Sequence, residues 1–402
     1  MTATPTRAEY FQDPYPLLAA RRAEDPVQWT HFFDEEAWFV TGFREADSML
    51  RDGRFTRQPP GEPDLTAGGA PVSAKVERCL LLKRDMVLLR DPPRHTRLRR
   101  LMAKVFTSRM LVEMEPAVRR ITLDLIEGMK GRRRHRLIRD FAYPLPILVV
   151  CELIGMPEED RHAARRWSES VIGLLDFNPT PEALEKVADD FLEAMDYFVD
   201  LSRRRREEPT GDLTSALTSA RDGDDQMTHE EVAANLMFMM TAGHETTMDI
   251  VASGFDLLLR DRDQLRRLAG DRALIPGAVE ETLRYEPPVF MTSRWVHEDV
   301  DFGGRRMREG DFVLLAVGGA HRDPRAFEDP DRFDIARTGR TLGFGAGPHY
   351  CVGAGLARLE AEIAIELLAR HLVAPELAEA PRWRETFITR GYEELAVEAE
   401  IA

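Results

Sequence analysis

Cysteine is scarce in this sequence, with three residues in a chain of 402. Cys79, Cys151 and Cys351 stand far apart, and no two of them form a Cys-x-x-Cys pair. This spacing argues against a disulfide framework and against a cysteine zinc site, because both need cysteines that are clustered or regularly paired. Any cysteine chemistry must therefore be done by one thiolate.

Basic residues are also fewer than acidic residues. The chain has 55 lysines and arginines against 70 acidic residues, which gives a formal net charge of -15. We therefore expect no nucleic-acid partner, since phosphate binding needs a basic face. The arginine-rich runs at residues 132–136 and 203–206 are interpreted as solvated helix ends, where cations interact favourably with the helix dipole.

Long apolar stretches and linker sequences are missing as well. The longest apolar stretches are broken by Pro144, Pro146 and Glu152 or by Gly243, and the N-terminus lacks a signal-peptide core, so we expect a cytoplasmic protein without a membrane anchor. No low-complexity linker interrupts the chain, which predicts a single domain over residues 1–402. A hydrophobic content of 43% is enough for a core that encloses a cofactor.

Most of the secondary-structure signals in the sequence predict helices. Three helices have recognisable N-terminal signals and are predicted from Asp91–Pro92 to about Phe106, from Thr180–Pro181 to the arginine run, and from a Thr228/Glu231 capping box to about Arg260. The last of these is long enough to cross a whole domain.

The C-terminal third mixes short elements. It predicts a helix from about Pro276 to Tyr285, short strands between Val289 and Val317, and a last helix from Cys351 to about His371. The fold class is therefore mainly α with small β-sheets.

The strongest local feature is the loop Phe344-Gly-Ala-Gly-Pro-His-Tyr-Cys351-Val-Gly353. It delivers a lone cysteine to a helix N-terminus, where unpaired N–H groups favour a thiolate. Gly345, Gly347 and Gly353 have no side chain that would keep a flat cofactor away from the backbone. Cys79 and Cys151 lack such a setting and are interpreted as small buried hydrophobes.

A second feature lies midway along the long apolar helix, in the hexapeptide Ala242-Gly243-His-Glu245-Thr246-Thr. An acid and two hydroxyls are costly to bury, and a glycine weakens the helix, unless these residues have partners or a task. The plain alternative is a helix kink with a threonine bonded to the preceding turn.

Both motifs resemble those of the cytochrome P450 family, and the resemblance extends in order along nearly the whole chain. It implies that family's fold, with haem b between the long central helix and the cysteine-loop helix. It also implies that Cys351 is the axial iron ligand, that Phe344 packs beneath the haem, and that His349 reaches a propionate. Gly345 and Gly353 then lie against the cofactor.

By the same resemblance, Ala242 and Gly243 border the haem and leave space for dioxygen. Glu245 is expected to be the acid of a proton relay and Thr246 the residue that steadies bound oxygen. This pair favours dioxygen as co-substrate. A peroxide-driven haem peroxygenase would not need Thr246, and a non-catalytic haem protein that only binds a ligand would need no relay.

Other residues match the family's supporting positions. Glu281 and Arg284, three apart on one helix face, together with Arg332, are expected to form a buried structural network under the cysteine loop. The resemblance assigns His95, Arg99 and Arg294 to the haem propionates, which need cationic partners when buried. His321 departs from the pattern, since many relatives have asparagine at that position.

Four further cations have two open interpretations. Arg97, Arg100, Lys104 and Arg358 are either simply solvated or form a docking surface for an acidic ferredoxin. The chain has no Gly-x-Gly-x-x-Gly fingerprint, so electrons are expected from NAD(P)H indirectly, through a ferredoxin reductase and a ferredoxin.

The predicted function is a monooxygenase that hydroxylates or epoxidises an apolar small molecule, such as a polyketide or terpenoid, and acts as a monomer. The resemblance places eight residues around the substrate, each of which could equally be ordinary core: Val87, Leu88, Asn235, Met239, Phe290, Met291, Phe387 and Ile388.

Overall fold

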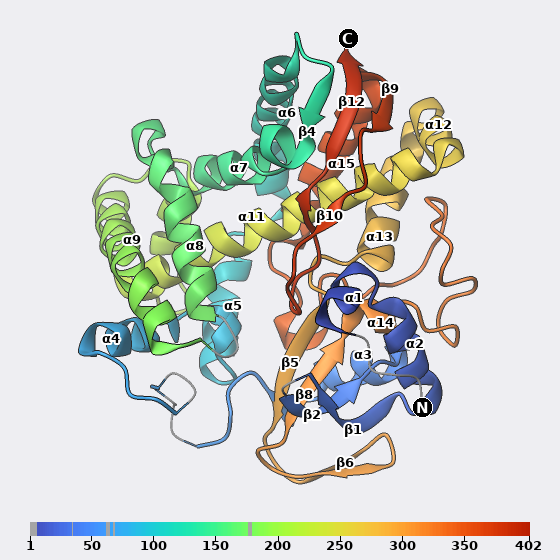
Figure 1. Ribbon diagram of the computed structural model, residues 1–402. Helices are drawn as coiled ribbons and strands as arrows, with labels where there is room; N and C mark the ends of the chain where they lie inside the picture. Colours follow the sequence, from blue (N-terminus) through green and yellow to red (C-terminus); the bar gives the residue numbers. More distant parts are fainter. Residues whose placement is uncertain (1–5, 34, 62–64, 67–68, 176–178) are drawn as a thin grey trace. The chain divides into compact units, whose positions relative to one another are not determined.

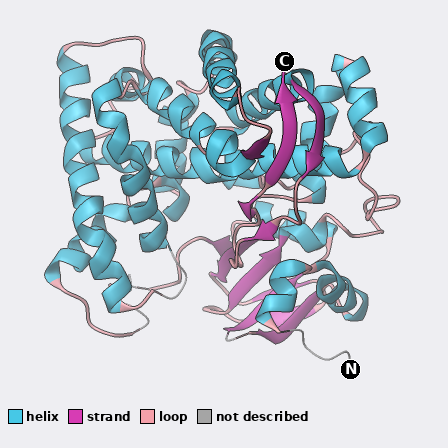
Figure 2. Cartoon of the chain, turned by 45° about the horizontal axis from the view of Figure 1, so that its top comes forward, coloured by secondary structure: helices cyan, strands magenta, loops and turns pink. Residues whose placement is uncertain are grey.

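The computed structural model describes residues 6–33, 35–61, 65–66, 69–175 and 179–402. By their contacts they form two compact units. We call Met1–Pro60, Arg119–Leu145 and Thr246–Ala402 the mixed unit, and Gly61–Val118 and Pro146–Glu245 the helical unit. Helices predominate over strands throughout (Figure 2), as the sequence predicts.

Three helices pass from one unit to the other without a linker: α6 (Ser108–Met129), α7 (Pro144–Ile154) and α11 (His229–Arg260). The other helices of the helical unit are α4 (Ala74–Lys83), η1 (Val87–Leu89), α5 (Arg94–Ala103), η3 (Glu158–Ala163), α8 (Ala164–Leu175), α9 (Pro181–Glu207) and α10 (Leu213–Ser219). Within this unit α9 packs against α8 and α4 (Figure 1), and also against α10.

Two predicted N-caps are confirmed. The Thr180 hydroxyl accepts the N–H of Ala183 at 3.2 Å, directly before α9. At the start of α11, Thr228 and Glu231 each accept the other's backbone N–H, at 3.1 and 3.0 Å. These bonds satisfy N–H groups that have no partner within the helix.

The predicted start of α5 is wrong. The helix begins at Arg94 with Pro93 as its N-cap, and it ends at Ala103 rather than near Phe106. A residue that precedes a proline is disfavoured in the α region, which excludes Pro92 from the helix. Asp91 still contributes, because its carbonyl oxygen accepts the N–H of His95 at 3.0 Å.

The described strands lie in the mixed unit. The largest sheet has the order β1-β2-β8-β5-β3 and is built from β1 (Val27–Phe32), β2 (Glu35–Val40), β3 (Phe55–Thr56), β5 (Met291–Val296) and β8 (Phe312–Ala316). Strand β2 is parallel to β8, and the other neighbours are antiparallel.

Smaller sheets are formed by β4 (Arg134–Arg136), β12 (Ala396–Ile401) and β9 (Leu372–Leu377), by β6 (Val300–Phe302) and β7 (Arg305–Met307), and by β10 (Arg382–Trp383) and β11 (Tyr392–Glu394). The helices of the mixed unit are α1 (Arg7–Gln12), α2 (Tyr15–Glu24), α3 (Phe43–Arg51), η2 (Ile138–Ala142), α12 (Arg262–Gly270), η4 (Arg272–Leu274), α13 (Ile275–Tyr285), α14 (Val317–Ala320), η5 (Gly347–His349) and α15 (Ala354–His371).

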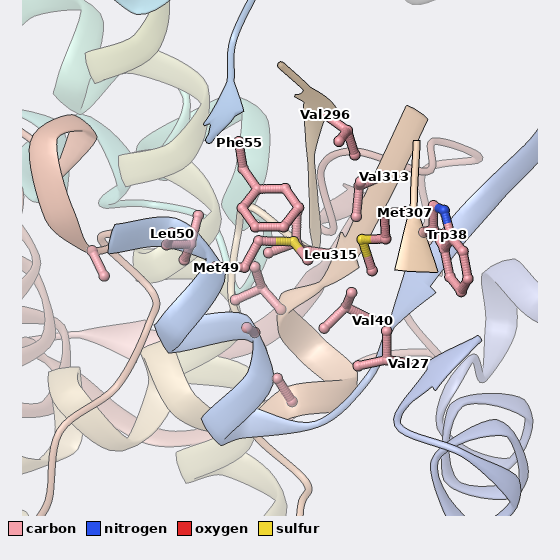
Figure 3. Close-up of a cluster of buried hydrophobic side chains, with 14 of the residues drawn as sticks. Val27, Trp38, Val40, Met49, Leu50, Phe55, Val296, Met307, Val313 and Leu315 are labelled. Atoms are coloured by element: carbon pink, nitrogen blue, oxygen red, sulfur yellow. The ribbon is translucent and has the colours of Figure 1, made fainter. Parts of the chain in front are cut away.

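A hydrophobic cluster fixes the large sheet against α3. Met49 and Leu50 of the helix and Phe55, Val313 and Leu315 of the sheet are buried together, and Figure 3 shows these side chains pointing toward one another. The same cluster includes Leu342 and Ala346 of the glycine-rich loop. The loop is thus attached to the core of the mixed unit by its own side chains.

The last long helix begins later than the sequence predicts. Helix α15 starts at Ala354, with Gly353 as its N-cap, so Cys351 precedes the helix by three residues. A turn over residues 352–353 occupies the interval, and the short helical turn η5 lies just before Cys351. Among the described residues, no helix is both long and apolar enough to cross a bilayer.

Candidate functional site

The loop from Leu342 to Cys351, here called the cysteine loop, is closed by backbone hydrogen bonds. Gly345 N–H donates to Leu342 C=O at 2.8 Å, and Cys351 N–H donates to Phe344 C=O at 2.9 Å. Tyr350 N–H donates to Gly347 C=O at 3.1 Å within the loop. The position of Cys351 is therefore determined by the turn that starts at Leu342.

Two glycines of the loop have conformations that other residues rarely adopt. Gly345 and Gly347 have φ of 72° and 65°, in the left-handed region. At Gly347 a side chain is also excluded by space, because a Cβ atom would overlap the Leu50 carbonyl oxygen and lie 2.9 Å from the Arg51 Cα. The loop therefore packs directly on the end of α3.

The three cysteines differ in their surroundings. Cys351 is half-buried, whereas Cys79 and Cys151 are buried. Burial raises the pKa of the Cys79 thiol to about 11, and it does the same for Cys151. Both stay protonated near neutral pH, which agrees with their interpretation as inert core residues.

An arginine from α15 packs on the cysteine loop. The Arg358 guanidinium carbon lies 4.4 Å from the centre of the Phe344 ring. Its Nε donates to Glu280 of α13 at 2.5 Å, and its Nη1 donates to the Tyr350 hydroxyl at 3.3 Å. Arg358 thus has an acidic partner in its own unit.

The buried network under the loop contains the predicted Glu281–Arg284 pair. Their charged groups lie 2.7 Å apart, and each side chain is 1% exposed. The prediction for Arg332 needs correction, because its side chain is 62% exposed and its guanidinium lies near Asp334. Arg332 offers only its carbonyl oxygen to Arg284, and Arg337 provides the second guanidinium, 3.2 Å from Glu281. The two arginines are five residues apart, and only the Arg337 guanidinium reaches Glu281.

The middle of α11 is accessible where the motif lies. Ala242, Gly243, Glu245 and Thr246 are half-buried, although almost every neighbouring residue of this helix is buried. At Gly243 the nearest atom to an added Cβ would be Val150 Cγ2 at 4.0 Å. We call these four residues the α11 window. The helix continues through it as one α-helix to Arg260.

The predicted propionate ligands divide between the units. His95 and Arg99 lie on α5 of the helical unit, His95 buried and Arg99 half-buried. Arg294 and His349 belong to the mixed unit. Arg294 is 4% exposed in β5, and its Nη1 donates to the Ser293 carbonyl oxygen at 2.7 Å. His349 is half-buried in the cysteine loop.

Of the predicted substrate residues in the helical unit, Asn235 is engaged with the backbone. Its Oδ1 accepts the Val87 N–H at 2.8 Å, and its Nδ2 donates to the carbonyls of Asp85 and Glu231 at 2.9 and 2.8 Å. Asn235 therefore ties the segment around Val87 to α11. Val87 and Met239 are buried, and Leu88 is half-buried.

In the mixed unit, four predicted substrate residues lie beside one another. The N–H groups of Phe290 and Met291 donate to the Ile388 carbonyl at 2.7 and 3.1 Å. Phe290 and Met291 belong to a buried aromatic cluster, and Phe387 packs against it, with its ring centre 4.8 Å from that of Phe11. These contacts are typical of ordinary core.

The sequence interpretation missed two buried acids on the second half of α11. Asp249 pairs with Arg384, while Asp256 accepts the Tyr392 hydroxyl at 2.6 Å and lies 2.8 Å from Arg260. The two acids are seven residues apart, so they lie on one helix face. That spacing of acids within an apolar run was a usable signal.

The remaining three candidate docking cations are paired within the helical unit. Arg97 bonds Asp225 and Glu231 at 2.8 and 2.6 Å. Arg100 and Lys104 both lie near Asp222, at 3.2 and 3.0 Å. Like Arg358, they are partly neutralised by acids of their own unit.

The residues present fit a haem with a single protein ligand. Among the described residues, no group of three or more His, Cys, Asp or Glu could hold a metal ion. The backbone beside Cys351 is bare, since a Cβ added at Gly345 would find its nearest neighbour at 3.6 Å and one at Gly353 at 4.0 Å. A flat group can approach that surface.

Comparison with known proteins agrees with this chemistry. The family described as Cytochrome P450 matches residues 171–376. The biotin biosynthesis cytochrome P450 of Bacillus subtilis is 36% identical over 395 residues, which cover 98% of each chain. The 6-deoxyerythronolide B hydroxylase of Saccharopolyspora erythraea is also 36% identical, over 96% of each chain.

A solved structure has the same fold. The crystal structure of P450BioI in complex with an acyl carrier protein ligated to hexadec-9Z-enoic acid superposes with a TM-score of 0.89. The identity is 36%, and the match covers 98% of this chain and 100% of that one. The family's cofactor is haem, and its named relatives are hydroxylases and monooxygenases. This chain belongs to the cytochrome P450 family of oxidoreductases.

Proposed function

We propose that this protein is a haem-thiolate monooxygenase that inserts one atom of dioxygen into an apolar small molecule, by hydroxylation or epoxidation. The α11 window is the observation that carries the proposal. Near the middle of this mostly buried helix, Ala242, Gly243, Glu245 and Thr246 are together half-buried. A protein that merely bound haem would not need an acid and a hydroxyl at this place.

Each residue has a distinct role in the proposal. Cys351, positioned by the closed turn of the cysteine loop, would hold the iron, with His95, Arg99, Arg294 and His349 as propionate partners. When bound, the haem supplies dioxygen activation and oxygen-atom transfer. The propionate partners carry charge or hydrogen-bond donors that a buried carboxylate requires.

The residues of the window would handle the proton. Gly243 leaves space beside the helix. Glu245 is half-buried, so its carboxyl group can exchange protons with solvent, and it would pass them toward Thr246. The Thr246 hydroxyl would be the hydrogen-bond donor that steadies dioxygen, and it would keep the proton path ordered.

The substrate class is proposed from relatives. Relatives at 32–39% identity include proteins named for polyketide biosynthesis and for hydroxylation of 6-deoxyerythronolide B. One structural neighbour holds a fatty acyl group on a carrier protein. We propose a secondary metabolite such as a polyketide or terpenoid, and electrons from NAD(P)H through a ferredoxin reductase and a ferredoxin.

The first test is an absorption titration of the purified ferric protein. The panel contains fatty acids, terpenoids, steroids and macrolides, with the fatty acids offered both free and attached to an acyl carrier protein. A true substrate should displace a water from the iron and shift the haem band toward high spin. Turnover with ¹⁸O-labelled dioxygen should then place one labelled atom in the product.

The outcomes separate the rival functions. Label from dioxygen in the product, with consumption of NAD(P)H, supports a monooxygenase. Product formation with hydrogen peroxide alone, at the same rate in a Thr246→Ala variant, would identify a peroxygenase. Tight binding without any product would identify a ligand-binding haem protein, and a Cys351→Ala variant with normal catalysis would refute the thiolate.

A further inference from the structure

His321 is a buried histidine outside the proposed catalytic group. It follows α14, directly after Ala320, and its side chain is 0% exposed. Two aromatic side chains lie next to it: the ring centres of Phe43 and Phe327 are each 6.2 Å from that of His321. A buried imidazole needs a hydrogen-bond partner for its ring nitrogens.

The partner is the first residue of the cysteine loop. His321 Nε2 accepts the Leu342 N–H at 2.7 Å, and the bond is buried. The Leu342 carbonyl in turn accepts the Gly345 N–H at 2.8 Å, and the Leu342 side chain lies in the core cluster of the large sheet. The N–H, the carbonyl oxygen and the side chain of Leu342 therefore each have a partner, and the partner of the N–H is His321.

The backbone of His321 is tied to the Glu281–Arg284 pair. Arg284 Nη1 donates to the His321 carbonyl oxygen at 3.1 Å, while its other nitrogens bind Glu281. His321 therefore stands between the buried ion pair and the loop. It contacts the pair through its main chain and the loop through its side chain.

The imidazole can serve as an acceptor only in its neutral form. Burial, together with the nearby Arg284 and Arg322 guanidinium groups, lowers the pKa of His321 to about 3. The ring is therefore neutral at any ordinary pH, with its proton on Nδ1 and the Nε2 lone pair available to Leu342.

We propose that His321 is a positioning residue for the haem ligand: by accepting the Leu342 N–H it fixes the start of the turn that places Cys351. The proposal rests on the haem-binding role proposed above for Cys351. Loss of the acceptor would leave a buried N–H unsatisfied, and the loop could relieve this only by moving. Such movement would displace the thiolate, whereas the core could remain folded.

The test compares His321→Gln with His321→Met. The two side chains have similar length and shape, but only glutamine can place an oxygen acceptor where Nε2 lies. The haem-loaded proteins are measured for haem loss to excess apomyoglobin, for the fraction of the ferrous–CO complex with the thiolate-type band, and for the reduction potential. Phe43→Leu serves as the control, since Phe43 packs on His321 and its side chain has no hydrogen-bonding group.

His321→Gln should behave like the natural protein. His321→Met should lose haem about tenfold faster, and it should show a reduced thiolate-type band and a shifted potential. Phe43→Leu should lower the thermal midpoint without these changes. Equal haem loss and equal spectra for the glutamine and methionine variants would overturn the proposal. If the natural protein itself formed no thiolate haem, the proposed function would fail instead.

Discussion

Thr246 and Thr247 are adjacent in α11 but differ in accessibility. Thr246 belongs to the half-buried window, whereas Thr247 is 1% exposed. We expect Thr246→Ala to keep haem and substrate binding but to lower the product formed per NAD(P)H about tenfold or more, because proton delivery is lost. Peroxide or water should take up the missing electrons, which a coupled assay for product and peroxide measures.

The neighbouring variant Thr247→Ala removes the same atoms outside the window. It should keep the natural coupling ratio, apart from a modest loss of stability. Equal uncoupling in both variants would mean that the effect comes from the helix rather than from the Thr246 hydroxyl. Unchanged coupling in Thr246→Ala would remove this residue from the relay.

Glu360 of α15 is a buried acid that the proposed mechanism does not use. It is 3% exposed, and its Oε2 has no hydrogen-bond partner among the described residues. Burial raises the pKa of its carboxyl group well above the ordinary 4.5. As the pH rises above that ordinary value, the unfolded chain releases this proton while the folded chain keeps it, so the free energy of unfolding falls.

Glu360→Gln should remove this pH dependence. The free energy of unfolding of the natural protein should fall by up to about 1.4 kcal/mol per pH unit between pH ~5 and the raised pKa, and the variant should lose that slope. Chemical denaturation at several pH values measures both. Glu376→Gln, at a site 74% exposed, is the control, and an identical slope in all three proteins would contradict the burial argument.

Residue-level predictions from the sequence succeeded where the determinant was local. The caps at Thr180 and Thr228 depend on residues three positions apart, so the spacing alone was enough. Arg332 and Arg337 show the opposite case. They are five residues apart, and only the packed structure decides which guanidinium reaches Glu281.

Among the elements, the cysteine loop depends on close contact with α3. Gly347→Ala should cost about 1–2 kcal/mol for a left-handed alanine, and more for the overlap with Leu50. We therefore expect a lower thermal midpoint and weaker haem retention. Gly304→Ala is matched in backbone conformation, with φ of 75° and no atom within 4 Å of an added Cβ. It should lose some stability but retain haem normally.

The type of most elements followed from sequence periodicity, but some boundaries did not. The predicted last helix included Cys351, while the actual one starts at Ala354. The loop is held by its closed turn and by α3, and no local pattern encodes that contact. The strands between Val289 and Val317 were predicted as a region, but their pairing with β2 and β3 is a property of the folded chain.

For the whole molecule, the net charge of -15 bears on electron transfer. An acidic ferredoxin would be repelled at long range, and the four candidate docking cations are paired with acids of their own units. We expect the rate at which this ferredoxin reduces the haem to rise as salt screens the repulsion. The relevant ionic strengths are those at which the Debye screening length falls from about 30 to about 8 Å. Stopped-flow measurements with an uncharged reductant provide the salt-independent reference.

The opposite salt dependence would be equally informative. A rate that falls steadily with salt would show that a local basic surface attracts the ferredoxin despite the net charge. Arg100→Gln, at a side chain 62% exposed, should then slow reduction markedly. Under our expectation the same variant leaves the rate nearly unchanged.

At this scale the family and its cofactor could be predicted from two motifs, because the loop and the hexapeptide are contiguous in sequence. The substrate could not. Asn235 is engaged with the backbone, and Phe290, Met291 and Phe387 pack in or against a core cluster. Whether a side chain faces core or ligand depends on packing that periodicity does not encode.

The sheet order β1-β2-β8-β5-β3 has a consequence for biosynthesis. Trp38 pairs with Val313 across β2 and β8. The N-terminal hairpin therefore cannot pair with β8 until most of the chain has been translated. The loop that ends at Cys351 emerges later still. Haem capture would then be one of the last events after synthesis, and a cell starved of the cofactor would accumulate completed, uncoloured chains rather than stalled nascent ones.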